Sequence, residues 1–315
     1  MEKEIYIPRH LKRKSFEVEN EKHQKKPAGN RRLSAYICLI TMALILFIVS
    51  ETGSPDANKP KPEEDVSTNL MPVDYRNQWL KNKAINPDYV GEIVFDSGLV
   101  SLSFVQAKDV YDHEGKPYVF YAQDGSVINE INEYTGNDVY IWKNWKNGEY
   151  DRYEEGGSIF MDYRNSLNDQ NLIIYGHHFA RDFDPSGNKQ FTPLDILLKE
   201  ENYEKNSTLK LILDNEIRSY QVCAVLILNA KDEKHLQIAR PDLNYDLEVE
   251  YDPEFVHEYI TLIDQLSVYH TGTQIDGHDR FLTLITCIEH QPDLRQAVIC
   301  RETGVIKYEA KEGQV

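Results

Sequence analysis

Short apolar runs separated by Gly, Asn and Asp dominate the chain after residue 90. Runs of this length bounded by turn-forming residues are typical of β-strands, and many in succession indicate a β-barrel or a β-sandwich. The pattern predicts a mainly β domain, with strands at 91–95, 99–105, 118–122, 138–142, 158–163, 171–176, 208–213, 219–228, 281–287 and 296–302.

Two segments have helical spacing instead. A short helix is predicted after Asp74, ending before Pro87, which cannot continue a helix. A longer one is predicted within 252–270, because Pro253 suits the first turn and apolar residues recur every three to four positions, at Phe255, Tyr259, Ile263 and Leu266. This second helix stands between two predicted strands.

Near the N-terminus, residues 33–50 contain no charged side chain. This length is close to the lower limit for a helix that crosses a bilayer. Residues 1–32 are rich in Lys and Arg and 51–70 in Pro, Asp and Glu, so the positive-inside rule predicts a cytoplasmic tail (1–32), a single-pass membrane anchor (33–50), a polar linker (51–70) and an extracellular domain (71–315). A cleaved signal peptide is the competing interpretation, but no small-residue cleavage site follows Val49.

Charge and cysteine usage narrow the function further. The net charge of −17 includes the basic tail, so the rest of the chain is more acidic than the total and is a poor candidate for binding nucleic acid. Of four cysteines, Cys38 lies in the predicted anchor, which leaves an odd number outside it. At least one of Cys223, Cys287 and Cys300 must stay a free thiol, and Cys223 and Cys300 lie in apolar strands typical of buried cysteines.

Cys287 ends an apolar strand, FLTLITC, and a nucleophilic thiol there needs a nearby imidazole. His177 and His178 directly follow another apolar strand, NLIIYG, and successive side chains diverge, which favours His177. A hairpin after Cys287 would return Arg295, whose guanidinium could donate to an oxyanion. Arg301 is the rival, but it lies about 20 Å further along the strand.

These residues resemble the sortase signature, in which a YGH strand end and a TLxTC strand are followed by arginine. The match covers NLIIYGHHF (171–179), FLTLITC (281–287) and Arg295, and it extends, with gaps, over about residues 75–308. The helix predicted before the TLxTC strand is a feature that the class B sortases share, so the resemblance is to this class in particular. Further matching positions are 86–95, 104–106, 157–165, Phe191, Leu194 and 255–272.

The resemblance implies an eight-stranded β-barrel and a cysteine transpeptidase without metal or organic cofactor. Cys287 would attack a C-terminal sorting motif of a surface protein, His177 would exchange a proton with the leaving or attacking amine, and Arg295 would stabilise the oxyanion. An amine of a peptidoglycan precursor or of another surface protein would resolve the thioester. Relative to the family, residues 107–136 are expected to be an insertion, and Ile285 replaces a frequent serine.

Other readings of the same residues are open. Water could resolve the thioester, which would make the chain a hydrolytic cysteine peptidase, and a non-catalytic surface β-domain could carry Cys287 as a structural thiol. The histidine and cysteine spacing does not follow common zinc patterns. The segment from Asp182 begins like a calcium loop, but Pro193 stands where the bidentate Glu should be.

Overall fold

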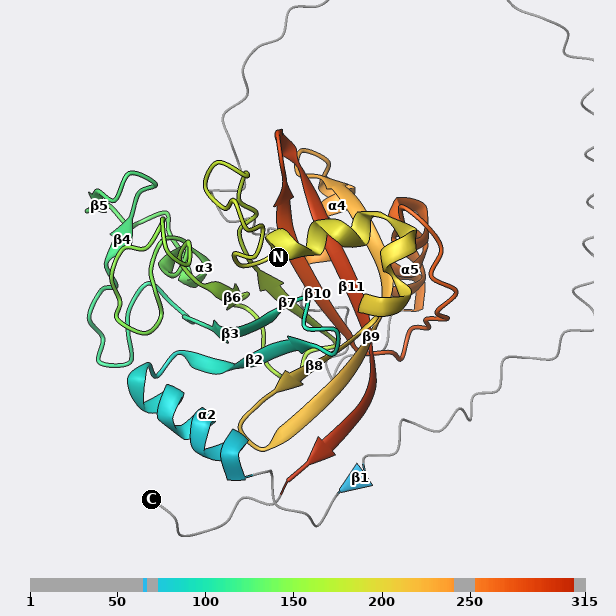
Figure 1. Ribbon diagram of the computed structural model, residues 1–315, viewed down its shortest axis with the longest axis horizontal. Helices are drawn as coiled ribbons and strands as arrows, with labels where there is room; N and C mark the ends of the chain where they lie inside the picture. Colours follow the sequence, from blue (N-terminus) through green and yellow to red (C-terminus); the bar gives the residue numbers. More distant parts are fainter. Residues whose placement is uncertain (1–64, 67–72, 241–252, 309–315) are drawn as a thin grey trace, which may run out of the picture. The chain divides into compact units, whose positions relative to one another are not determined.

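The computed structural model describes residues 65–66, 73–240 and 253–308. Eight strands form a closed sheet in the order β11-β10-β7-β6-β3-β2-β8-β9, and β9 pairs with β11 to complete the barrel (Figure 1). The strands are β2 Tyr89–Phe95, β3 Ser101–Val105, β6 Ile159–Met161, β7 Asn171–Tyr175, β8 Thr208–Ile212, β9 Glu216–Asn229, β10 Phe281–Ile288 and β11 Gln291–Lys307. The prediction of an eight-stranded barrel is confirmed.

Helices and 3-10 turns lie around the barrel, and one further strand, β1, pairs with it. The helices are α2 Val73–Ile85, α3 Gly136–Val139, α4 Glu233–Leu236 and α5 Pro253–Leu266, with 3-10 turns η2 Thr192–Leu198, η3 Glu200–Asn202, η4 Glu204–Asn206 and η5 Gln237–Ala239. Both predicted helices are present as α2 and α5, and α5 stands between β9 and β10 in the chain. Strand β1, Asp65–Val66, falls within the predicted linker and pairs in parallel with the end of β11.

Both faces of the central strands are buried, which explains why their sequences read as continuous apolar runs. Along β10, Leu282 and Leu284 enter one core cluster, whereas Phe281 and Ile285 enter the other. Tyr259 and Ile263 of α5 belong to the second cluster. The periodicity of two in the strand therefore divides its side chains between two cores, and α5 covers one of them.

Two of the ten predicted strands lie outside the barrel. Within 118–122, β4 (Phe120–Tyr121) pairs only with β5 (Val127–Ile128), so the expected insertion 107–136 contains a separate hairpin (Figure 1).

The strand predicted at 138–142 is wrong, because α3 occupies its first half. Thr135 and Asp138 form a reciprocal capping box there, and the buried Asn137 donates to Asp162 Oδ2 at 3.1 Å. Capping and a buried polar contact thus outweigh the apolar strand pattern.

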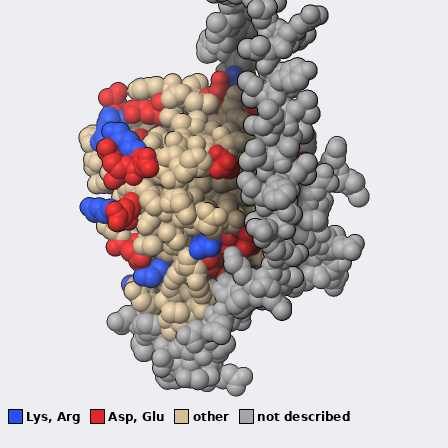
Figure 2. Space-filling view, turned by 90° about the vertical axis from the view of Figure 1, so that its right-hand side faces the viewer, with Lys and Arg blue, Asp and Glu red and all other residues tan. Residues whose placement is uncertain are grey.

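The predicted tail and anchor, 1–32 and 33–50, lie outside the described residues. In the part of the chain that the structure describes, no helix combines the length and the apolar character needed to cross a membrane. Figure 2 shows one face of the domain, on which basic side chains lie beside acidic ones around a largely uncharged centre.

Candidate active site

Cys287 and Arg295 face each other across the antiparallel β10–β11 pair. The register makes them direct cross-strand partners, so their side chains leave the same face of the sheet. Arg295 is only 4% exposed, and Cys287 is partly exposed at the edge of a core cluster. The predicted hairpin therefore does bring the arginine back to the cysteine.

An irregularity in the hairpin sets the direction of Arg295. Ile288 pairs with Gln291, whereas the preceding Cys287 pairs with Arg295, so residues 292–294 are extra residues on β11. Such bulges re-aim side chains beside functional sites. Here the bulge carbonyls of Pro292 and Leu294 accept hydrogen bonds from Arg295 Nη1, at 2.8 and 2.7 Å. The hairpin that supplies the guanidinium also fixes its position.

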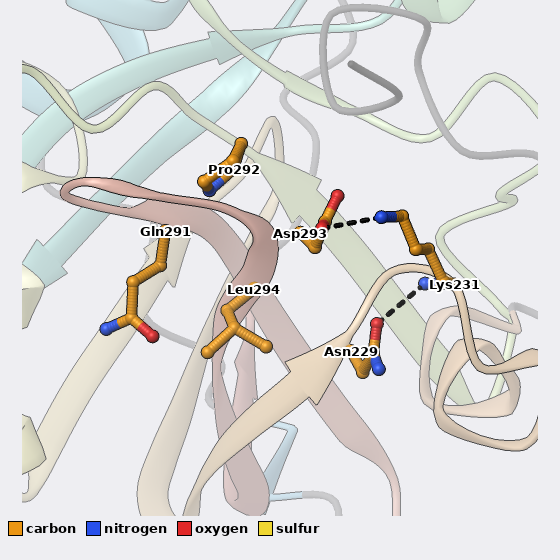
Figure 3. Close-up of a pocket in the computed structure, with 6 residues that line it drawn as sticks. All are labelled: Asn229, Lys231, Gln291, Pro292, Asp293 and Leu294. Carbon is orange, nitrogen blue, oxygen red and sulfur yellow. Dashed lines mark hydrogen bonds and ion pairs between the residues drawn. The ribbon is translucent and has the colours of Figure 1, made fainter. Parts of the chain in front are cut away.

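The bulge is tied to the end of β9. Asp293 pairs with Lys231 Nζ at 2.7 Å (Figure 3). The carbonyl of Asp293 also accepts from Ala230 N at 2.7 Å. A shallow hollow of about 500 Å³ lies here, lined by Asn229, Lys231, Gln291, Pro292, Asp293 and Leu294. Neither the candidate nucleophile nor the candidate imidazole lines this hollow.

His177 reaches the same end of the sheet from the other neighbour of β10. Strand β7 runs parallel to β10, with Tyr175 opposite Ile285, so His177 and Cys287 each lie two residues beyond a paired position. Gly176 allows this close exit, because a Cβ at that residue would stand 2.6 Å from the ring of Phe191. The three predicted residues thus come from the ends of three adjacent strands, β7, β10 and β11.

The imidazole of His177 is held on several sides. It stacks on Trp142 with ring centroids 4.3 Å apart, and Phe179 approaches it edge-on at 5.4 Å. Its Nε2 lies 2.9 Å from the carbonyl of Ile141. Because a carbonyl can only accept, this contact assigns the ring proton to Nε2 and makes Nδ1 the nitrogen that can take a further proton. The backbone N–H of His177 donates to Gln190 at 2.6 Å.

Burial lowers the pKa of His177 to about 4, and the Ile141 carbonyl opposes this effect only in part. The imidazole is therefore neutral at pH 7. The ring becomes an imidazolium only when Nδ1 accepts a proton. We therefore expect His177 to act as a base that removes the thiol proton, because the ring is not already charged before the reaction.

This pKa predicts how stability depends on pH. The unfolded chain binds a proton on His177 below about pH 6.5, but the folded protein binds it only below about 4, so unfolding takes up a proton between these values. The free energy of unfolding should therefore fall by about 3 kcal/mol, relative to a His177→Gln variant, as the pH drops through this window. Urea unfolding at several pH values measures the difference, and parallel curves for the two proteins would contradict the prediction.

His178, the neighbouring candidate, is engaged elsewhere. Its Nε2 lies 2.7 Å from Asp195 Oδ2 in η2, and its side chain is buried. Arg301, the rival arginine, pairs with Phe281 at the far end of β10 and donates to the carbonyl of Gln274 at 3.1 Å. Arg301 therefore lies at the opposite end of β10 from Cys287, and the imidazole of His178 is paired with Asp195.

Cys223 and Cys300 are free, buried thiols in the described chain. Burial raises the pKa of Cys223 to about 12 and that of Cys300 well above its ordinary value. Both are therefore poor nucleophiles, in contrast to the partly exposed Cys287.

In the described residues, no group of three or more His, Cys, Asp or Glu is placed to hold a metal ion. In the candidate calcium loop, Asp184 is 1% exposed, and its carboxylate accepts from Ser186, Gly187 and Lys189 of its own loop. The carboxylate stabilises the loop that precedes Gln190.

Sequence reasoning missed the residues that hold His177. Ile141 and Trp142 lie in the segment for which a strand was predicted, and Gln190 lies in a polar loop with no distinguishing pattern. Only the positive φ of Gln190, 43°, marks it as unusual, and that is visible only in the structure.

A β-barrel that joins a partly exposed thiol, a buried imidazole and a fixed guanidinium at the ends of adjacent strands has the parts of a cysteine acyl-transfer enzyme. No family model matches the chain. Sortase B of Listeria monocytogenes is 24% identical over 228 residues, 71% of this chain and 72% of the relative. Sortase B of Staphylococcus aureus is 28% identical over 147 residues, 45% of this chain and 52% of the relative.

Solved structures agree on the fold. Clostridium perfringens sortase B has a TM-score of 0.52 at 24% identity and covers 71% of this chain and 98% of its own. S. aureus sortase B has a TM-score of 0.52 at 22% identity and covers 74% of this chain and 89% of its own. The chain is thus similar to class B sortases in sequence and has their barrel, and these relatives indicate a cysteine transpeptidase.

Proposed function

We propose that this chain is a membrane-anchored, extracellular class B-like sortase. It would cleave a C-terminal sorting motif of surface proteins and transfer the product to an amine of a peptidoglycan precursor or of another surface protein. The observation that carries the proposal is the direct cross-strand pairing of Cys287 with Arg295, beside the strand end that presents His177. The uncharged run 33–50 and its basic lead-in support the anchor and its orientation.

In the first half of the proposed reaction, Nδ1 of His177 takes the proton of the Cys287 thiol, and the thiolate attacks the carbonyl carbon of the scissile peptide. The guanidinium of Arg295 donates to the oxyanion that forms. The C–N bond then breaks, the leaving amine receives the proton from His177, and the acyl group stays on Cys287 as a thioester.

In the second half, the acceptor amine loses a proton to His177 and attacks the thioester carbonyl. Arg295 stabilises the second oxyanion, the C–S bond breaks, and the thiolate recovers its proton. The three side chains suffice for both halves, because each proton is returned and no net redox change occurs. Water in place of the amine would give hydrolysis by the same steps.

Thiol alkylation tests the pairing of Cys287 with His177. At pH 7 and 25 °C, iodoacetamide should label Cys287 selectively, and His177→Ala should slow labelling at least about tenfold, since the base that removes the thiol proton is lost. His178→Gln is the matched control and should label within about twofold of the wild type. Peptide mapping by mass spectrometry identifies the labelled thiol.

An unreactive Cys287 in folded protein would contradict the proposal and favour the structural-thiol reading. Labelling of Cys223 or Cys300 at a similar rate would show that the preparation is unfolded, because both thiols are buried and have raised pKa values.

A further inference from the structure

A buried lysine directly follows, in the sequence, the two residues that contact the imidazole of His177. Ile141 and Trp142 touch the imidazole through a carbonyl and a ring, and Lys143 comes directly after them. Lys143 is only 6% exposed, although lysine is rarely buried without a partner. The reaction proposed above makes no use of this amine.

Lys143 lies between aromatic rings and near a buried carboxylate. Its Nζ is 4.9 Å from the ring centroid of Tyr118 and 5.8 Å from that of Tyr140. Burial lowers the pKa of Lys143 to about 8, and the charge of Asp88 opposes this shift. Cation–π contacts and an opposite charge are the two interactions that make a buried ammonium tolerable.

Asp88 is only 4% exposed, and several polar side chains around Lys143 contact its carboxylate. Its carboxylate accepts from Tyr118 at 2.5 Å and Tyr140 at 2.7 Å, and lies 2.8 Å from His113 Nε2. We call Asp88, His113, Tyr118, Tyr140 and Lys143 the Asp88 cluster. Its members come from the residue that precedes β2, from the expected insertion 107–136 and from the segment that contacts His177.

The insertion 107–136 also contacts the segment around Lys143 at a second site, through residues 121 and 123. The carbonyl of Gln123 accepts from Tyr150 Oη at 2.6 Å and from Arg152 at 3.0 Å, and the ring of Tyr121 lies against that of Tyr150 at 5.7 Å. The backbone at Lys143 forms a bridge with Tyr150. The insertion therefore packs against the segment that supports His177.

We propose that the Asp88 cluster is a positioning device for His177, in which Lys143 fixes the backbone of Ile141 and Trp142 and the insertion 107–136 completes the site that holds Lys143. The inference rests on the proposed function and assigns a role to the insertion. A small displacement of the imidazole is enough to misalign proton transfer, so the cluster should govern turnover more than substrate binding.

The segment has anchors that do not depend on the lysine side chain. Ser158 Oγ donates to the Lys143 carbonyl at 2.8 Å and accepts from Trp145 N at 3.0 Å, and Ser158 N donates to Tyr140 O at 3.1 Å. A Lys143→Met variant, which keeps most of the length of the unbranched side chain and removes its charge, should therefore fold.

The test compares Lys143→Met with Lys146→Met, an exposed lysine of the same loop that rests on Trp145. For Lys143→Met we expect kcat for peptide cleavage to fall at least about tenfold, with KM within about twofold. The pKa of His177, measured by NMR, should rise toward its ordinary value, because the imidazole is less tightly enclosed and burial penalises its charged form less. Lys146→Met should change none of the three.

Tyr118→Phe provides a second variant, since it removes only the hydroxyl that bonds Asp88 from the insertion. It should shift kcat and the pKa of His177 in the same directions by smaller amounts. Wild-type values of both quantities in folded Lys143→Met would overturn the inference. A wild-type protein that forms no acyl-enzyme would instead refute the proposed function, and the pKa of His177 would still report on positioning. If Lys143→Met does not fold, Tyr118→Phe with wild-type values is the overturning result.

Discussion

Replacing Cys287 by alanine should abolish cleavage of a sorting peptide, with a loss in kcat of about 10⁴-fold or more. The reason is that no other described thiol can take over: Cys223 and Cys300 are buried, and their pKa values are raised. Cleavage is measured by chromatography of the released peptide. Circular dichroism should show an unchanged fold, because Cys287 lies at the end of its strand and is only partly buried.

Cys223→Ala is the matched control, since it removes a thiol from β9 and should retain activity. Substantial cleavage by Cys287→Ala would mean that the acyl group is not carried on this sulfur. Loss of activity in both variants, with both folded, would show that the assay does not report on the candidate nucleophile alone.

Replacing Arg295 by methionine should lower kcat by about 10² to 10³-fold with a small change in KM, because the guanidinium acts on charge that develops only in the transition state. Arg295→Lys should recover only part of this loss. A lysine keeps the charge but cannot reproduce the planar fork that bonds the bulge carbonyls of Pro292 and Leu294.

Arg301→Met on the same strand is the control, because Arg301 pairs with Phe281 at the far end of β10. Its kcat should stay within about twofold of the wild type. If Arg301→Met fell as far as Arg295→Met, the oxyanion role would not belong to Arg295.

Much of the barrel could be predicted from its apolar runs, because the central strands are buried on both faces and their runs are continuous and bounded by turn-forming residues. The pairing of Cys287 with Arg295 also followed from the sequence, since a proline-containing loop between two strong strands predicts a hairpin. The bulge at 292–294 was not predictable, because it depends on the contacts of Asp293 with Ala230 and Lys231, which follow β9.

The residues that contact His177 could not be predicted from the sequence, for a different reason. The run 138–142 has the apolar content of a strand, but the capping box of Thr135 and Asp138 starts a helical turn in its place. The resulting loop delivers Ile141 and Trp142 to the imidazole through tertiary contacts only. Local pattern carries no information about such contacts, although the capping box itself is a recognisable signal.

Ile285, which stands where the resembling family often has a serine, is a core residue of the barrel. The residue is 3% exposed, belongs to a core cluster and pairs with both Tyr175 and Ala297. It stabilises the sheet from which Cys287 and His177 project. Any hydroxyl assistance to the thiol would therefore have to come from another residue.

The most direct test of the proposed function is the mass of the protein after brief incubation with peptides that contain candidate sorting motifs. A soluble chain of residues 71–315 should gain the mass of the N-terminal peptide fragment on Cys287, and hydroxylamine or an acceptor amine should release it. The same incubation with Cys287→Ala should leave the mass unchanged. Cleavage of the peptide by wild-type protein with no adduct, and undiminished cleavage by Cys287→Ala, would contradict a thioester mechanism.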